Sequence, residues 1–221
     1  MLTRYCSSGR RAKGRGGFTL VELLVVIAVI GMVVVLAVPT IEPMMKGSKL
    51  TAAADDLRFK LSGYRQRCVA ENRPIEVRFL KFIDTAVPGG RNAYRAYVAG
   101  RFRQERKSSG DGAFVFEPID NVVRLPEGVV ISSIPEFSTV VHNDQVRHGT
   151  HELPVADQPN AEFASFAFRP DGSTDLPKRA GDIWFLTIMT ERDDVAGAPS
   201  PDNFITLAID AYNGSVRSYS R

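Results

Sequence analysis

Apolar residues are concentrated in one long run near the start of the 221-residue chain. The segment 18–38, FTLVELLVVIAVIGMVVVLAV, has Glu22 as its only charged residue, and 23–38 has no strongly polar side chain. A helix rises about 1.5 Å per residue, so this segment would be roughly 30 Å long and would match the hydrocarbon core of a bilayer. The pattern therefore predicts a transmembrane helix over 18–38.

A second helical pattern follows two prolines, Pro39 and Pro43. Its apolar positions recur at intervals of three and four residues, which is typical of an amphipathic helix packed on its own domain. These positions are Leu50, Ala54, Leu57, Leu61, Tyr64 and Cys68. We expect one long helix over 18–72, with an amphipathic stalk at 44–72 and with Cys68 as a small core residue. Because proline lacks an amide hydrogen and clashes with the preceding turn, we also expect a kink or break at Pro39.

From Ile75 onward, apolar and polar residues alternate with period two between turn-forming residues, which predicts strands. The expected strands cover 75–82, 94–103, 113–117, 128–132, 163–169, 183–190, 204–210 and 215–219. The last two would form a hairpin across 211–214, where an Asn-Gly pair favours a tight turn. The segment 134–162, rich in Pro, His, Asn and Asp, is expected as an exposed loop. The sequence thus predicts an α+β fold, in which the helix is followed by an antiparallel, sandwich-like β head at 73–221.

Charge is distributed as unevenly as apolarity. Of the 28 basic residues, five lie in 1–17, which contains no acid, while 18–221 holds the other 23 and all 25 acidic residues. The formal charge of +3 therefore divides into +5 for the leader and −2 for the rest. A basic leader before an apolar run orients a membrane helix with its N-terminal side in the cytoplasm. An ordinary secretory signal fits less well, because its apolar core has about 7–15 residues and 39–43 (PTIEP) is a poor cleavage site.

Glu22 is the feature that a plain signal anchor does not explain. Insertion scales assign a cost of about 2–3 kcal/mol to a carboxylate within such a run. One explanation is a carboxylate that snorkels to the membrane edge without a partner. The other is that Glu22 has a partner, because an ionisable residue within a membrane segment is by default a functional site.

The residues around Glu22 carry a specific resemblance. The segment 16–24, GGFTLVELL, resembles the processing site of type IV prepilins and type II secretion pseudopilins. The resemblance implies that a membrane-embedded prepilin peptidase removes the leader 1–17 by cutting between Gly17 and Phe18, and that Phe18 is then N-methylated. It further implies that Glu22 pairs with the Phe18 amine of a neighbouring subunit during assembly, and that the helix bends at Pro39. Two charges that would each be costly in an apolar environment are tolerable as a pair.

The head carries a second, broader resemblance. The run 168–173, FRPDGS, is similar to the F-x-P-x-G segment of minor pseudopilins that include the H-type subunit of type II secretion and FimT-like minor pilins. The segments 72–79, 124–129, 168–174 and 213–217 resemble the Verru_Chthon cassette protein D family of pilin-like proteins. This resemblance implies a pilin-like role with no known biochemical activity.

Residues that carry chemistry are few. His142, His148 and His151 cluster in the expected loop, and 191–194 (ERDD) is the densest acidic stretch. A metal site needs three or four ligands in defined geometry, and a calcium site needs several oxygens from one loop. We favour solvated histidines and a solvated acidic loop over metal sites. No phosphate-binding loop, dinucleotide motif or nucleophile elbow occurs in the sequence, so we expect no cofactor, no bound metal and no enzyme activity.

Nucleic-acid binding is the rival function, because some FimT-like minor pilins bind DNA during uptake. The basic candidates, interleaved with Phe102, are Arg101, Arg103, Arg106, Lys107, Arg217 and Arg221. Against this function, the segment 18–221 has a formal charge of −2 and no overall basic bias. A charged hairpin that faces solvent is the interpretation we favour.

These observations favour a minor pilin or pseudopilin, a structural subunit of a type II secretion or type IV pilus-like filament. Its expected partners are prepilin peptidase, other pilin or pseudopilin subunits and the inner-membrane assembly platform, with no small-molecule substrate. It would be a single-pass inner-membrane protein with its head in the periplasm, before joining a filament that extends toward the outer membrane or cell surface. The alternatives are a membrane-anchored periplasmic binding module and a DNA-binding minor pilin. The sequence is compatible with secretion, adhesion, motility or DNA uptake, and with a major or a tip subunit.

Overall fold

The computed structural model describes residues 18–85, 89–106, 112–151, 160–178, 183–195, 201 and 203–220, without the side chains of 34–46, 105, 106, 112 and 113. The chain divides into two compact units, Met1–Met44 and Met45–Arg221. The long helix α1, Leu20–Glu71, begins in the first unit and ends in the second. The predicted leader 1–17 lies outside the described residues.

The backbone of α1 is helical through Pro39 and Pro43, so the helix is not interrupted where we expected a break. The kink at Pro39 stays a prediction, because a helix can bend at a proline without being interrupted. Among the residues that the structure describes, no helix combines the length and apolarity needed to cross a membrane. The predicted transmembrane part, 18–38, extends past the last described side chain of this segment, that of Val33.

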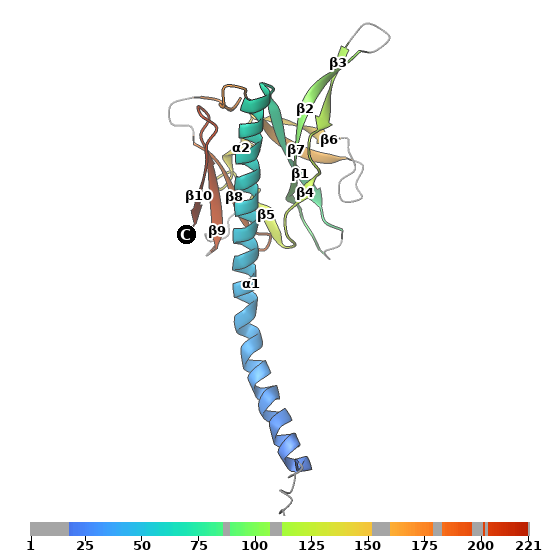
Figure 1. Ribbon diagram of the computed structural model, residues 1–221, viewed down its shortest axis with the longest axis vertical. Coiled ribbons are helices and arrows are strands. Elements are labelled where there is room, and N and C mark those ends of the chain that lie inside the picture. The colour runs from blue at the N-terminus through green and yellow to red at the C-terminus, as the bar shows by residue number, and fades with distance from the viewer. Residues whose placement is uncertain are drawn as a thin grey trace, which may run out of the picture. The chain divides into compact units, whose positions relative to one another are not determined.

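The second unit is built on one antiparallel sheet, which confirms the predicted helix followed by an antiparallel β head (Figure 1). The strands of its described part are β1 Ile75–Ile83, β2 Asn92–Arg106, β3 Gly112–Pro118, β4 Val123–Arg124, β5 Val129–Ile131, β6 Arg147–His151, β7 Ala161–Phe168, β8 Trp184–Thr190, β9 Phe204–Ile209 and β10 Val216–Ser220. Their order is β10-β9-β8-β5-β2-β1-β7-β6, with β3 and β4 paired to β2. The sandwich-like expectation implied two facing sheets, whereas these strands form one hydrogen-bonded sheet.

The predicted exposed loop 134–162 is wrong in its described part. A short helix, α2 Thr139–His142, and the strand β6 lie within it. Val140, Val141 and Val146 are buried in the core, and β6 pairs with β7 at the edge of the sheet. β6 was missed because its sequence, RHGTH, has no apolar alternation, and the four residues of α2 are too few for a helical period to show.

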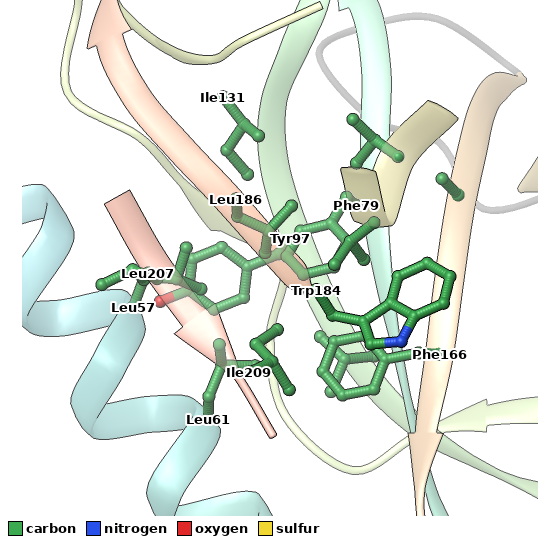
Figure 2. Packing of buried hydrophobic residues seen from close by; sticks show 14 of the residues in the cluster. Leu57, Leu61, Phe79, Tyr97, Ile131, Phe166, Trp184, Leu186, Leu207 and Ile209 are labelled. Atoms are coloured by element: carbon green, nitrogen blue, oxygen red, sulfur yellow. The ribbon is translucent and has the colours of Figure 1, made fainter. Parts of the chain in front are cut away.

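One face of the sheet packs against the amphipathic part of α1. The six apolar positions predicted on the seam of α1 are all buried, and Cys68 is a free thiol with no exposed surface. Figure 2 shows Leu57 and Leu61 of α1 beside aromatic and aliphatic side chains of the strands, among them Tyr97. Burial raises the pKa of the Cys68 thiol, which donates to the carbonyl oxygen of Phe168 at 3.2 Å. Cys68 is therefore a core residue, as its place on the seam predicted.

Polar contacts fix α1 on this face. The hydroxyl of Tyr97 donates to Asp56 at 2.8 Å, and the hydroxyl of Tyr64 donates to Asp120 at 3.2 Å. Lys60 also pairs with Asp120, at 3.2 Å. Burial, and then the adjacent Asp120, raises the pKa of Tyr64, so this phenol remains a hydrogen-bond donor at neutral pH.

The opposite face of the sheet is also buried around β1. Along β1, Val77 and Phe79 point into the core beneath α1, while Leu80 and Phe82 belong to a second cluster that includes Val98. A register shift against β2 lies between Leu80 and Lys81. Side chains of a strand point alternately to the two faces of its sheet. Because both faces are covered at β1, a polar residue on this strand is buried whichever face it points to.

Two turns meet on α1 through Arg65. The Nε of Arg65 donates to the carbonyl oxygens of Gly172, at 3.2 Å, and Asn213, at 2.6 Å. Gly172 and Gly214 have positive φ angles of 83° and 65°, and the turn at Gly214 is the one predicted over 211–214. A Cβ at Gly214 would overlap the carbonyl oxygen of Gly172.

We therefore expect Gly214→Ala to destabilise the protein by about 2 kcal/mol or more, because it combines a left-handed backbone with a steric overlap. Gly128→Ala is the matched control, since Gly128 has a φ of 77° and a Cβ added there would meet no atom within 4 Å. Urea unfolding of the full-length chain, followed by the fluorescence of its single tryptophan, buried Trp184, measures both. Equal losses in the two variants would show that the contact between the two turns contributes nothing.

Candidate functional site: the N-terminal segment and the polar clusters of the head

Helix α1 begins with a reciprocal pair of hydrogen bonds between Thr19 and Glu22. The amide of Glu22 donates to Oγ1 of Thr19 at 3.2 Å, and the amide of Thr19 donates to Oε2 of Glu22 at 3.4 Å. Thr19 immediately precedes the first helical residue, Leu20, so this is a capping box. The T-x-x-E spacing is visible in the sequence, but we did not predict a cap from it.

The capping box gives Glu22 a local partner and places its carboxylate beside the backbone amide of Thr19. The carboxylate also lies at the positive end of the helix dipole, where a negative charge is stabilised. This local contact tests neither interpretation of Glu22 given above, the snorkelling carboxylate or the pairing with another subunit, and both stay predictions. If cleavage makes Phe18 the first residue, its ammonium is one residue away from the Thr19 amide that donates to Glu22.

The remaining surface of this segment is apolar. Phe18 is 78% exposed, and large apolar side chains cover the described turns that follow it. They are Leu20, Val21, Leu23, Leu24, Val25, Val26, Ile27, Val29, Ile30, Met32 and Val33. A continuous apolar surface of this kind marks a site that contacts a membrane or another protein. Gly17 lies outside the described residues.

The predicted histidine cluster does not form a metal site in the described part of the chain. His148 and His151 are three residues apart on β6, so the strand directs them to opposite faces. His148 is exposed and its Nε2 lies 3.2 Å from the carbonyl oxygen of Asn143, whereas His151 is buried. No group of three histidine, cysteine or acidic side chains among the described residues is placed to hold a metal ion.

His151 instead joins a buried charged cluster that we did not predict from the sequence. Nε of Arg78 donates to Oε1 of Glu76 at 2.7 Å, and Nη1 of Arg78 lies 3.3 Å from Nδ1 of His151. The more exposed Arg147 reaches the other oxygen of Glu76 at 3.3 Å. The Arg78 guanidinium also lies 3.6 Å from the centre of the Phe116 ring. Glu76 and Arg78 are only 4% and 7% exposed, and His151 is 1% exposed, so the prediction of a solvated histidine is wrong for His151.

His142, at the end of α2, is expected to make the protein less stable in acid. Burial lowers the pKa of its imidazole, and Lys81 and His148 act in the same direction, while a backbone contact at Ser133 and the charge of Asp194 oppose them. As the pH falls through about 6.5, the imidazole of His142 binds a proton in the unfolded chain more readily than in the folded chain. Protonation therefore lowers the free energy of unfolding as the pH falls.

The His142→Gln variant should accordingly lose less unfolding free energy than the wild type between pH 7.5 and pH 5.5. Urea unfolding at the two pH values measures this difference. His148→Gln, which removes an exposed imidazole, is the control. An identical pH dependence in His142→Gln and wild type would contradict this role for His142.

The acidic stretch 191–194 holds loops together. The carboxylate of Asp194 is buried and accepts from Oγ of Ser132 at 2.8 Å and from the amide of Ser133 at 2.9 Å. Hydrogen bonding to Arg95 lowers the pKa of Glu191, which also accepts from the amide of Arg91 at 3.0 Å. The expectation of a solvated loop is therefore wrong for Asp194.

The basic candidates whose side chains the structure describes, Arg101, Arg103 and Arg217, do not form one patch. Arg101 pairs with Glu71 at the end of α1, and hydrogen bonds from Arg67 and Arg101 lower the pKa of that carboxyl. Arg103 lies 3.8 Å from Glu117 on the neighbouring strand. Arg217 is exposed on β10, at the far end of the strand order from β6. The side chain of Arg106, and the whole of Lys107 and Arg221, lie outside the described residues.

The comparisons with known proteins concern the N-terminal segment and the fold. Residues 12–38 match the family model described as a prokaryotic N-terminal methylation motif. A solved structure, the type IV minor pilin FimU of Pseudomonas aeruginosa, aligns with 79% of this chain and 89% of its own, at 13% identity and a TM-score of 0.41. No curated protein sequence matches the chain. The chain thus carries the methylation motif of type IV pilin-like proteins, which implies processing by a prepilin peptidase and assembly with pilins.

Proposed function

We propose that this chain is a minor pilin or pseudopilin, a structural and non-enzymatic subunit of a type II secretion or type IV pilus-like filament. The observation that carries the proposal is the match of residues 12–38 to the N-terminal methylation motif, because that segment contains Gly17, Phe18 and Glu22. In this function the peptidase cuts between Gly17 and Phe18, and Phe18 is N-methylated. The exposed apolar surface from Phe18 to Val33 supports burial in a membrane before assembly and against other subunits afterwards.

The proposed partners are the prepilin peptidase, other pilin or pseudopilin subunits and the inner-membrane assembly platform. The precursor is anchored in the inner membrane by 18–38 with its head in the periplasm, and later enters a filament. Glu22 holds either the amide of its own Thr19, as in the capping box, or the methylated amine of a neighbour. If Glu22 exchanges one partner for the other, the hydrogen bonding at the start of α1 would change when a neighbouring subunit docks.

The mass of the N-terminus in protein extracted from membranes tests this function. The expected result is a chain that starts at N-methylated Phe18, and a Gly17→Val variant that retains Met1, because a bulkier residue blocks the peptidase. An intact N-terminus in the wild type would overturn the proposal and favour a membrane-anchored periplasmic binding module. A gel shift of processed protein on DNA that weakens steeply with salt would instead support a DNA-binding minor pilin.

A further inference from the structure

The turn between β9 and β10 contains an asparagine followed by a glycine, Asn213 and Gly214. An asparagine in this position can lose its side-chain amide, because the main-chain nitrogen of the next residue can attack its side-chain carbonyl carbon. Glycine has no side chain to obstruct the approach and bends easily into the reactive geometry. Asn213 is exposed to solvent in the structure. The turn therefore places a reactive pair of residues where water reaches it.

Asp210 holds two of the reacting groups. Its Oδ2 accepts a hydrogen bond from Nδ2 of Asn213 at 2.8 Å, and its main-chain carbonyl oxygen accepts from the amide of Gly214 at 2.7 Å. The side-chain oxygen of Asn213 accepts from the amide of Ser215 at 2.7 Å. The leaving group, the nucleophile and the carbonyl of the reaction are thus each engaged in a hydrogen bond that must break or bend before they can react.

The main chain of the turn is fixed as well. The carbonyl oxygen of Asn213 accepts from Nε of Arg65 on α1, at 2.6 Å. Gly214 lies so close to the neighbouring turn that a Cβ on it would overlap the carbonyl oxygen of Gly172. Movement of the Gly214 nitrogen toward the Asn213 side chain would therefore disturb contacts with α1 and with the second turn.

We propose that Asn213 is a site of spontaneous deamidation, which the folded head holds in check through Asp210. In the reaction the nitrogen of Gly214 forms a bond to Cγ of Asn213, while the bond from Cγ to Nδ2 breaks. Nδ2 leaves as ammonia and takes the proton of the Gly214 amide, which gives a cyclic imide. Water then opens the ring at either carbonyl and yields aspartate or isoaspartate at position 213. The reaction needs no reagent other than water, and it occurs whether or not the chain enters a filament.

Neither product fits the turn as the structure has it. Aspartate replaces the Nδ2 donor with a carboxylate oxygen, which would face Oδ2 of Asp210 across 2.8 Å, and two carboxylates at this distance repel. Isoaspartate lengthens the main chain by one methylene group directly before Gly214, which would have to shift against the turn at Gly172. Deamidation would therefore loosen the β9–β10 turn from Arg65 and α1.

Mass spectrometry of the peptide that contains Asn213 tests the site in the full-length chain. We expect deamidation at Asn213 when the chain is unfolded in urea, and a rate lower by about tenfold or more in the folded chain, because hydrogen bonds must break first. Asn121, which precedes the β-branched Val122, is the internal reference and should react more slowly in urea. No deamidation at Asn213 in urea overturns the site, and equal rates in the folded and unfolded chain overturn its protection by the fold.

Two aspartate variants of the folded chain test the role of Asp210. Asp210→Ala removes the acceptor of the Asn213 amide and should raise the rate of deamidation by about tenfold. Asp171→Ala is the matched control, because Asp171 accepts from the amide of Ser173 at 2.9 Å in the other turn that Arg65 holds, and its loss should leave the rate unchanged. Unchanged Trp184 emission verifies that each variant is folded. Equal acceleration in both variants, or none in Asp210→Ala, overturns the role of Asp210.

The variant Asn213→Asp reproduces the first product and tests its effect on the head. We expect its urea midpoint to be lower than that of the wild type, and Asp210→Asn in the same chain to restore most of the loss, because an amide then again faces a carboxylate. A midpoint equal to that of the wild type, or a loss that Asp210→Asn does not restore, overturns the proposed repulsion in the turn.

Discussion

Replacing Glu22 with lysine is expected to leave removal of residues 1–17 largely intact and to abolish incorporation of the subunit into a filament. The lysine would place a second cation where the carboxylate is expected to meet the Phe18 ammonium of a neighbour, and a buried like-charge pair is strongly unfavourable. It also removes the acceptor of the Thr19 amide at the start of α1. The N-terminal mass measures cleavage, and the amount of subunit in sheared filaments measures incorporation.

Glu22→Gln is the matched control for this experiment. Glutamine can keep the capping box, because its side-chain oxygen accepts from the Thr19 amide, but it carries no charge. We expect this variant to be cleaved and to enter filaments poorly, since the neighbour's ammonium stays uncompensated. Normal incorporation of Glu22→Gln would show that the cap, and not the charge, is what Glu22 contributes. Normal incorporation of Glu22→Lys would contradict both roles.

The parts of the fold that were predictable are those in which one face of an element is buried. The seam from Leu50 to Cys68 repeats with the helical period, and all of its members are buried. The strands β1, β7, β8 and β9 are predictable from apolar residues and the turns between them, and the Gly172 and Gly214 turns from Pro-Asp-Gly and Asn-Gly. These signals are local, so they do not depend on knowing the sheet order.

The features that were missed depend on contacts between distant segments. β6 is a polar edge strand, and only its pairing with β7 makes it a strand. Glu76 and Arg78 alternate with apolar residues along β1 as a solvent face would, and nothing local indicates that the β2–β3 arm covers them. Phe116, which lies against the Arg78 guanidinium, is about forty residues further along the chain. His151 was likewise expected in solvent and is buried beside that guanidinium.

The capping box is different, because its signal is local and was present. Thr19 and Glu22 are three residues apart at the start of the apolar run, which is the spacing that a capping box requires. The resemblance to prepilins predicts a partner in another subunit, and it does not indicate a role for Glu22 within its own helix. The two roles use the same carboxylate, which is why the glutamine variant is informative.

The buried cluster on β1 leads to the second large effect. Removing the carboxylate of Glu76, as in Glu76→Leu, should destabilise the head by about 3–5 kcal/mol, because it breaks a buried ion pair with Arg78. Arg147, whose side chain is 57% exposed, also pairs with the Glu76 carboxylate, at 3.3 Å. Its truncation, Arg147→Ala, should cost no more than about 1 kcal/mol. Urea unfolding of the full-length chain, followed by Trp184 fluorescence, gives both values.

The double variant Glu76→Leu/Arg78→Met decides whether charge or shape is responsible. Replacing both members of a buried ion pair with apolar residues of similar volume is often neutral, and the methionine would lie among Phe102, Phe116 and Phe163. We therefore expect the double variant to recover most of the stability that Glu76→Leu loses. Recovery would mean that packing among these aromatic rings, and not the charge of the pair, is what this site contributes to stability. A double variant as unstable as Glu76→Leu would mean that the charges themselves hold the β2–β3 arm against β1 and β6.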